Sequence, residues 1–185
     1  RGLGDVYKRQ NKERQNMATR ARVALQLKED KIIGSYQHWD GYPGGLGYNL
    51  IDNWYKADKV EKAIMLGDAS KWGQFIGEKI DFDDREADSY DYQNVYYGRD
   101  RGEKDCNHKV YTSEQAYLEN GFKSGEDYIY LGKLTGEKDF LGKPMLTWFY
   151  AKYDMKKFMP VEGEAIREHI ESLKRHLAEN VKEAA

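Results

Sequence analysis

The sequence predicts an α+β domain, in which an antiparallel sheet carries helices on one face and a long amphipathic helix ends the chain. Three observations favour this class: strand-like segments over 23–39, 128–131 and 145–153, short helical patterns between them, and a helical repeat of apolar residues after Glu162. With 185 residues the chain is long enough to build one core, and no proline-rich linker divides it. We therefore expect a single domain over residues 17–185.

Residues 1–16 are expected to lie outside this domain. Residues 5–10 read Asp-Val-Tyr-Lys-Arg-Gln, which resembles the translated end of a transposon adapter used in sequencing libraries. Met17 is then the expected natural start of translation. Because segments of this kind do not belong to the fold, they are set aside before the elements are assigned.

The first elements of the domain are expected to form a β-hairpin. Apolar residues alternate with polar or small ones, as in a half-buried strand, at Val23, Leu25 and Leu27. A polar turn over 28–31 leads into a returning strand over 32–39. The hairpin thus delivers the chain into a glycine-rich segment.

Short helices and a strand are expected before the aromatic strands over 128–131 and 145–153. Acidic or hydroxyl residues placed before an apolar repeat are typical helix caps, and a glycine after the repeat is a typical stop. These signals predict a helix over 48–55, a helix over 58–66 capped by Asp58, a strand over 95–97, and a helix through Asn120 capped by Thr112 or Ser113.

Residues from Glu162 onward predict a long amphipathic helix with one apolar stripe. The stripe consists of residues at helical spacing, namely Ile166, Ile170, Leu173, Leu177 and Val181. Two arrangements are open for it. The stripe packs on the sheet, which is the commoner arrangement and the one we favour, or it packs on a partner.

Composition and charge exclude several classes of partner. The formal net charge is −2, so the chain has no global basic field that would attract duplex nucleic acid. No apolar run approaches the ~20 residues that span a bilayer. The single cysteine, Cys106, excludes an internal disulfide and a cysteine-rich zinc site. We therefore expect no membrane partner, no duplex nucleic acid and no cofactor.

Residues 38–50 form the one stretch whose composition a buried core cannot explain. They combine a histidine, a tryptophan, an acid, two tyrosines, a proline and four glycines between a strand-like and a helix-like pattern. The amides of Gly44, Gly45 and Gly47 precede the predicted helix, where they are placed to form a nest for a phosphate. The alternative is structural: a tight turn built from glycine and proline.

Residues 97–103 read Tyr-Gly-Arg-Asp-Arg-Gly-Glu and favour the same chemistry. Arginine holds phosphate through two parallel hydrogen bonds, and in an extended chain Arg99 and Arg101 face one side while Asp100 faces the other. The alternative is an Arg–Asp network that binds no ligand. Since nearby aromatic rings can stack on bases, the expected ligand-binding residues are His38, Trp39, Asp40, Tyr42, Gly44, Gly45, Tyr48, Tyr97, Arg99 and Arg101.

Catalytic and metal-binding alternatives have weaker signals. If the chain is an enzyme, His38 and Asp40 share one strand face as an acid–base pair, and His108 with Cys106 forms a nucleophile couple or part of a metal site. The signatures of a nucleophile elbow and of a His-Glu-x-x-His helix are both missing. The acidic run over 81–91 is either a solvated loop or a calcium site, but it lacks the glycine of a calcium loop. We expect no catalytic residues and no resident metal.

Four sequence blocks stand in a fixed order along the chain. They are residues 19–24 (Thr-Arg-Ala-Arg-Val-Ala), residues 38–43 (His-Trp-Asp-Gly-Tyr-Pro), the stretch from Val60 to Leu-Gly-Asp at 66–68, and residues 97–103. In these blocks the chain resembles a family of small proteins common in phage and prophage genomes. The resemblance covers roughly residues 17 to 103, and it implies a viral origin rather than a particular reaction.

A small phage protein with a pocket for phosphate and base, and without catalytic machinery, is expected to sequester a nucleotide. Some phages carry sponge proteins against the CBASS and Thoeris defences, whose signals are cyclic oligonucleotides and cyclic ADP-ribose derivatives, and the step from this chain to them is an analogy. Tight capture favours a deep pocket shared between subunits, so we expect a homo-oligomer in the cytoplasm of the infected bacterial host. The alternatives are an enzyme that cleaves or modifies such a nucleotide and a protein-binding inhibitor of a host factor. The acidic charge disfavours single-stranded nucleic acid.

Overall fold

The computed structural model describes residues 18–86 and 88–184, and the expected read-through segment over 1–16 lies outside the described residues. The strands are β1 (Ala21–Lys28), β2 (Lys31–Gln37), β3 (Ala69–Lys71), β4 (Val95–Tyr96), β5 (Lys109–Tyr111), β6 (Tyr128–Lys138), β7 (Pro144–Lys152) and β8 (Met159–Pro160). The helices are the π-helix η1 (Pro43–Gly47), α2 (Tyr48–Asn53), α3 (Ala57–Met65), α4 (Asp88–Tyr92), α5 (Tyr97–Arg101), α6 (Glu114–Asn120) and α7 (Glu162–Ala184).

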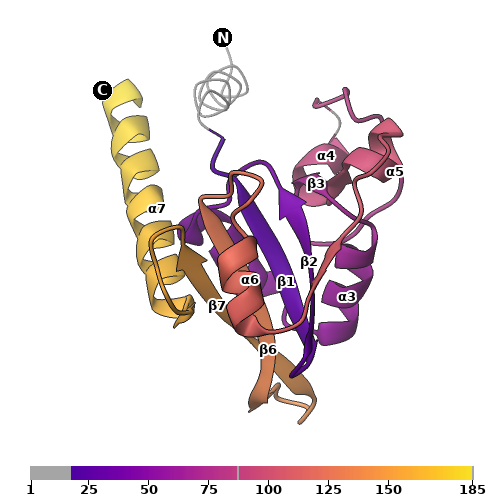
Figure 1. Ribbon diagram of the computed structural model, residues 1–185. Coiled ribbons are helices and arrows are strands. Elements are labelled where there is room, and N and C mark those ends of the chain that lie inside the picture. Colours follow the sequence, from indigo (N-terminus) through magenta and orange to yellow (C-terminus); the bar gives the residue numbers. More distant parts are fainter. Residues whose placement is uncertain (1–17, 87, 185) are drawn as a thin grey trace.

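The α+β class is confirmed, with a sheet of mixed rather than purely antiparallel pairing. The strand order is β4-β3-β2-β1-β6-β7-β8, and β5 pairs with β2 off this path (Figure 1). Most neighbours are antiparallel, but β1 pairs with β6 and β2 with β3 in parallel. The parallel pairs follow from long connections, because a chain that leaves the hairpin and crosses the sheet can return in the same direction.

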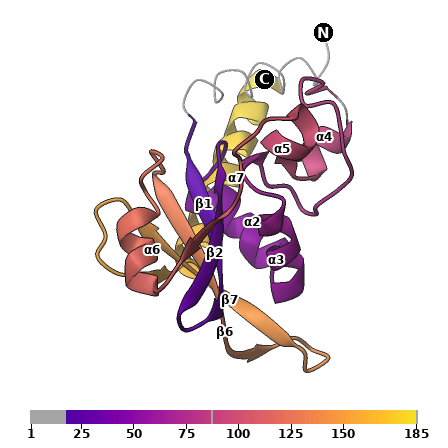
Figure 2. The same cartoon turned by 45° about the vertical axis from the view of Figure 1, so that its right-hand side comes forward.

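Helices cover both faces of the sheet, whereas the sequence predicted one face. One face carries α2, α3 and the start of α7 over a core that includes Val23, Leu25 and Trp54. The opposite face carries α6, and the two layers are separated by the sheet in Figure 2. Tyr117 of α6 is fully buried there, and its hydroxyl donates to the backbone oxygens of Arg22 and Tyr130 at 3.2 and 3.1 Å.

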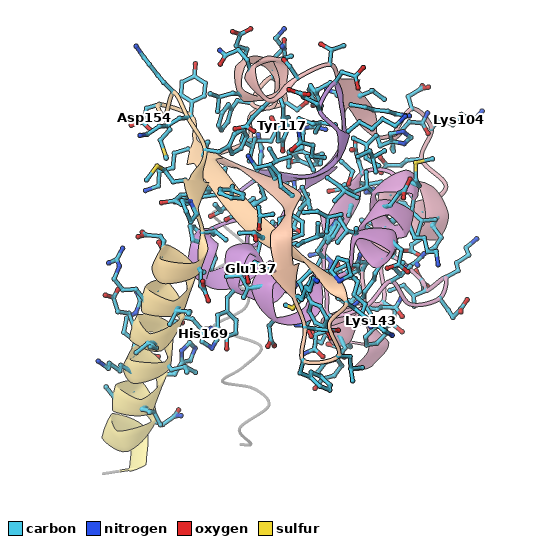
Figure 3. All side chains as sticks on the ribbon, turned by 90° about the horizontal axis from the view of Figure 1, so that it is seen from below. Lys104, Tyr117, Glu137, Lys143, Asp154 and His169 are labelled. Carbon is cyan, nitrogen blue, oxygen red and sulfur yellow. The ribbon has the colours of Figure 1, made fainter. Side chains whose placement is uncertain are left out.

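Strand β1 is therefore buried on both faces and not half-buried as predicted. Val23 and Leu25 face the core under α2 and α3, while Ala24 faces the second core with Tyr117, near the α6 layer in Figure 3. Arg22 is also buried, and its guanidinium is neutralised by Glu126 through contacts of 2.6 and 3.0 Å. A buried cation with a carboxylate partner explains how a charged residue can occupy a central strand.

The predicted hairpin and helices are confirmed, with two corrections. Ser113 caps α6 by accepting a hydrogen bond from the Ala116 amide at 3.0 Å. The cap residue of α3 is Lys56, and Asp58 lies in its first turn, where a carboxylate favours the helix dipole. Residues 97–101 are the helix α5 and not an extended segment. Arg99 and Arg101 therefore do not share one strand face.

The apolar stripe of α7 is exposed and does not pack on the sheet. Its four described side chains are Ile166 at 40%, Ile170 at 45%, Leu173 at 51% and Leu177 at 65% of full exposure. The Val181 side chain, the last member of the predicted stripe, lies outside the described part of the structure. Among residues 18–86 and 88–184 no helix combines the length and the apolar character needed to cross a membrane.

Candidate ligand-binding cavity

The candidate site is a cavity of about 230 Å³ where β2 runs into η1. Four of the ten predicted ligand-binding residues line it, namely Trp39, Asp40, Tyr42 and Gly45. The remaining lining residues come from β2, the helices and the segment that follows β3, and they are Gln37, Leu46, Asn49, Lys71, Trp72, Gly73, Gln74 and Asp91. The glycine-rich stretch over 38–50 thus forms one wall, and β3 with its following residues forms the other.

Close backbone contacts explain the glycines of this wall. Asp40 adopts a positive φ of 57°, and its carbonyl accepts the Leu46 amide at 2.9 Å. A Cβ added at Gly45 would lie 2.7 Å from that carbonyl and 2.9 Å from the Tyr42 ring. The amides of Gly45 and Gly47 donate to the Tyr42 carbonyl at 3.1 and 3.4 Å. The structural interpretation of a tight turn therefore accounts for these two amides.

The third amide of the predicted phosphate nest holds a carboxylate of the chain itself. The Gly44 amide donates to Glu168 Oε2 of α7 at 2.8 Å. Beside it, the Tyr48 ring stacks on His169 with the ring centroids 3.8 Å apart and the planes 4° from parallel. Gly44 and Tyr48 therefore fix the start of α7 against η1 and α2 and do not line the cavity.

The cavity wall is rigid because its amide side chains are bonded to backbone. Gln37 accepts the Trp72 amide at 3.1 Å and donates to the Trp39 carbonyl. Asn49 donates to the carbonyls of Trp72 and Gly73 at 3.1 and 3.0 Å. Side chains that are held in this way keep a cavity in one shape before any ligand arrives.

One buried donor in this wall has no partner. Trp72 is only 4% exposed, and its indole Nε1 makes no hydrogen bond with the described residues. Buried polar groups are nearly always paired, so an unpaired one in a cavity wall needs an explanation. The nitrogen has almost no accessible surface, so the Trp72 residue lines the cavity while its N–H lies behind that lining.

Lys71 brings a cation to the same cavity. Its ammonium donates to the carbonyls of Asp91 and Tyr90 at 3.0 and 3.3 Å and lies 3.6 Å from the Asp91 carboxylate. Burial lowers the pKa of Lys71, and the charges of Asp91 and Asp40 oppose that shift. The cavity thus contains one cation and two carboxylates, a set that suits a polar ligand with both donors and acceptors.

His38 lies outside the cavity, because side chains alternate along the end of β2. Its Nδ1 shares a hydrogen bond with the Tyr36 hydroxyl at 2.8 Å. Its ring lies edge-on to the Trp39 ring, with the two ring centroids 4.6 Å apart. Burial, with the charges of Arg20 and Arg85, lowers the pKa of His38. The predicted pairing of His38 with Asp40 is therefore not formed at the cavity.

The block over 97–103 is a closed structural unit. All five N–H groups of Arg99 are used: they donate to the Asp100 carboxylate at 2.7 and 2.9 Å and to the carbonyls of Ile76, Gly77 and Asn94 at 2.8–3.1 Å. Arg101 is exposed, pairs with Glu103 at 3.2 Å and lies over the Phe82 ring. Tyr97 packs on Phe82 at 5.4 Å. Tyr97, Arg99 and Arg101 do not line the cavity, and the Arg–Asp network is the arrangement observed.

The other predicted catalytic residues do not join a common site. His108 lies in the segment before β5 and does not line the cavity. Burial and the neighbouring acids raise the pKa of the Cys106 thiol, which disfavours the reactive thiolate. Within 18–86 and 88–184 no group of three His, Cys, Asp or Glu side chains is placed to hold a metal, and the described acids over 81–86 are exposed.

Comparison with protein-family models, with curated proteins and with solved structures finds no match to this chain. The arguments about function therefore rest on the cavity itself. Sequence reasoning missed Lys71 and Trp72 as site residues. The one available signal was an aromatic residue followed by glycine, Trp72-Gly73, in a segment without a clear helix or strand pattern.

Proposed function

We propose that this chain is a binding protein that sequesters a small nucleotide-derived ligand, with the base of that ligand in the cavity. The observation that carries the proposal is a cavity that three aromatic side chains, Trp39, Tyr42 and Trp72, line together with Lys71. A nucleobase offers ring nitrogens and carbonyl oxygens as acceptors for the Lys71 ammonium in the same wall. Its flat face suits the aromatic rings.

Size and charge indicate which part of the ligand the cavity would take. A volume of about 230 Å³ is below the ~300–1,000 Å³ of pockets for whole drug-sized ligands, and it suits one ring system better than a complete cyclic dinucleotide. The carboxylates of Asp40 and Asp91 would repel phosphate inside the cavity. We therefore place the base inside and the phosphates toward solvent, which replaces the glycine nest as the expected contact.

The biological setting of the proposal rests on the resemblance to phage proteins and on analogy. The ligand would be a host defence signal of the cyclic oligonucleotide or cyclic ADP-ribose type, and the protein would act as an immune-evasion factor in the cytoplasm of the infected bacterial host. A homo-oligomer belongs to the same proposal. Sequestration requires that the ligand leaves the protein chemically unchanged.

The test is thermal stabilisation of the purified chain by a panel of cyclic dinucleotides, cyclic trinucleotides, cyclic ADP-ribose isomers and mononucleotides. We expect stabilisation by at least one of them, and intact ligand on chromatography after the protein is denatured. Altered ligand would indicate an enzyme instead. No stabilisation by any member of the panel would contradict the proposal and favour a protein partner.

Two variants locate the binding event. Trp39→Ala removes one aromatic ring from the cavity wall, so we expect roughly tenfold weaker affinity, within the ~1–3 kcal/mol of one base-stacking contact. Arg101→Ala is the matched control, because this exposed arginine was predicted as a ligand residue but lies outside the cavity. Equal losses in both variants would place the ligand somewhere other than the cavity.

A further inference from the structure

Side chains in the first half of helix α7 fix the helix to the domain. Ala165 is fully buried, the Glu168 carboxylate accepts the Gly44 amide, and the His169 ring stacks on Tyr48. Figures 1 and 3 both show the C-terminal half of the helix standing away from the sheet, and Figure 3 shows His169 on the side that faces the rest of the chain. The second half of α7 therefore needs another source of stability.

An isolated helical segment as short as the second half of α7 is only marginally stable in water. The sequence nevertheless gives α7 a continuous apolar edge that runs from its anchored first half into its projecting second half. Four large aliphatic side chains, 40–65% exposed, are spaced by four, three and four residues along α7: Ile166, Ile170, Leu173 and Leu177. An alternation of three and four is the spacing of the seam between two helices of a coiled coil.

We propose that α7 pairs in an antiparallel manner with α7 of a second copy of this chain. The spacing of four, three and four reads the same in both directions, so the stripe is complementary to itself when one helix is reversed. In that pairing Ile166 lies opposite the partner's Leu177, and Ile170 lies opposite the partner's Leu173. A two-fold axis then relates the copies, as is usual for homodimers.

The charges beside the stripe permit this pairing. Arg167 is held by Glu164 and Glu171 of its own helix, at 2.7 and 3.7 Å. With Lys174, this flank of the helix carries two acids and two bases and no net charge. A flank without net charge leaves the apolar contact as the main contribution to association on this side of the stripe.

The area of the stripe sets the strength of the dimer. The four side chains expose roughly 400 Å² in one copy, so a pair of helices buries ~800 Å², less than the ~1,200 Å² of standard stable interfaces. We therefore expect a reversible dimer whose population depends on protein concentration. The dimer would supply the homo-oligomer of the proposed function, but its formation depends on the stripe and not on the ligand.

The first experiment is sedimentation equilibrium of the full chain over a wide range of concentration. The wild-type chain should shift from monomer to dimer as its concentration rises. Leu173→Glu should remain monomeric at high concentration, and its circular dichroism should differ from that of the wild type only by the contribution of α7. Leu141→Glu is the control, because Leu141 is as exposed as Leu177 but lies in the turn between β6 and β7. A wild-type chain that stays monomeric overturns the proposal, as does a dimer that Leu173→Glu leaves intact.

Cross-linking tests the direction of the pair. In a Cys106→Ser background, which removes the native thiol, a mixture of the Ile166→Cys and Leu177→Cys chains should form a mixed disulfide dimer under mild oxidation. Each of these chains alone should cross-link much less, since an antiparallel pair separates the two identical positions along the axis. Efficient cross-linking of Ile166→Cys with itself would overturn the antiparallel arrangement.

Discussion

Residues 38–50 and residues 97–103 contain similar side chains but have opposite roles in the structure. Both segments combine glycine with aromatic and charged residues, and both follow a strand. The first segment lines a cavity with Trp39, Asp40 and Tyr42. The second folds into the short helix α5, whose Arg99 is fully bonded within the chain. Similar composition therefore does not imply a similar function.

The difference lies in whether the polar groups find partners inside the domain. Arg99 meets a carboxylate and three carbonyls, so no donor is left for a ligand. Trp72 has a donor that the described residues leave unpaired, and it lies in a cavity wall. Three other buried polar atoms, Arg22 Nη1, Ser35 Oγ and Tyr111 OH, are also unpaired but do not line this cavity, so the cavity lining and not the unpaired group marks the candidate site.

The largest effect is expected from Arg99→Ala. The change leaves the buried Asp100 carboxylate without its cation and removes hydrogen bonds from the carbonyls of Ile76, Gly77 and Asn94. We expect a loss of about 3–5 kcal/mol in the free energy of unfolding, because one partner of a buried ion pair is removed. Urea denaturation measures it.

The matched control for this change is Arg101→Ala, two residues away in the same helix. Arg101 is exposed and its ion pair with Glu103 lies at the surface, so we expect a loss of less than about 1 kcal/mol. A ligand-binding role for Arg99 would produce the reverse pattern, with little loss of stability and a large loss of affinity. That result would contradict the structural role assigned to residues 97–103.

Much of the fold could be predicted because its signals are local. The hairpin of β1 and β2 and the Ser113 cap of α6 depend on neighbours in the sequence. The burial of β1 on both faces could not be predicted in this way. It depends on Tyr117 and β6, which reach β1 only through long-range packing.

The site was predictable in part for the same reason. The stretch over 38–50 stands out by composition, and Trp39, Asp40, Tyr42 and Gly45 do line the cavity. Gly44 lies elsewhere because Glu168, more than a hundred residues later, takes its amide. No local pattern specifies a contact of that kind, nor does it specify that Lys71 is brought beside Asp40 and Asp91.

A smaller effect is expected when a methyl group is added to one glycine of each segment. In Gly45→Ala the new Cβ would lie 2.7 Å from the Asp40 carbonyl, so we expect a loss of about 1–3 kcal/mol from overpacking. In Gly98→Ala the nearest atom is 3.7 Å away, in a helix, so we expect a gain of up to ~1 kcal/mol. Thermal unfolding of both variants measures the difference, and equal losses would contradict the assigned packing.

The smallest effect is a pH dependence that arises from His38, which belongs to the first segment but lies outside its cavity. Burial and two arginines lower the folded-state pKa of His38 below the ~6.5 of the unfolded chain. Its contribution to stability is therefore fully present above about pH 6.5 and is lost as the pH falls through the folded-state pKa. Because the ring is partly exposed, we expect less than about 1 kcal/mol. The measurement is urea unfolding of the wild type and of His38→Gln between neutral and mildly acidic pH, so that the difference between the two chains reports on His38. The two curves of unfolding free energy against pH should converge as the pH falls. Parallel curves would show that the neighbours of His38 do not lower its pKa.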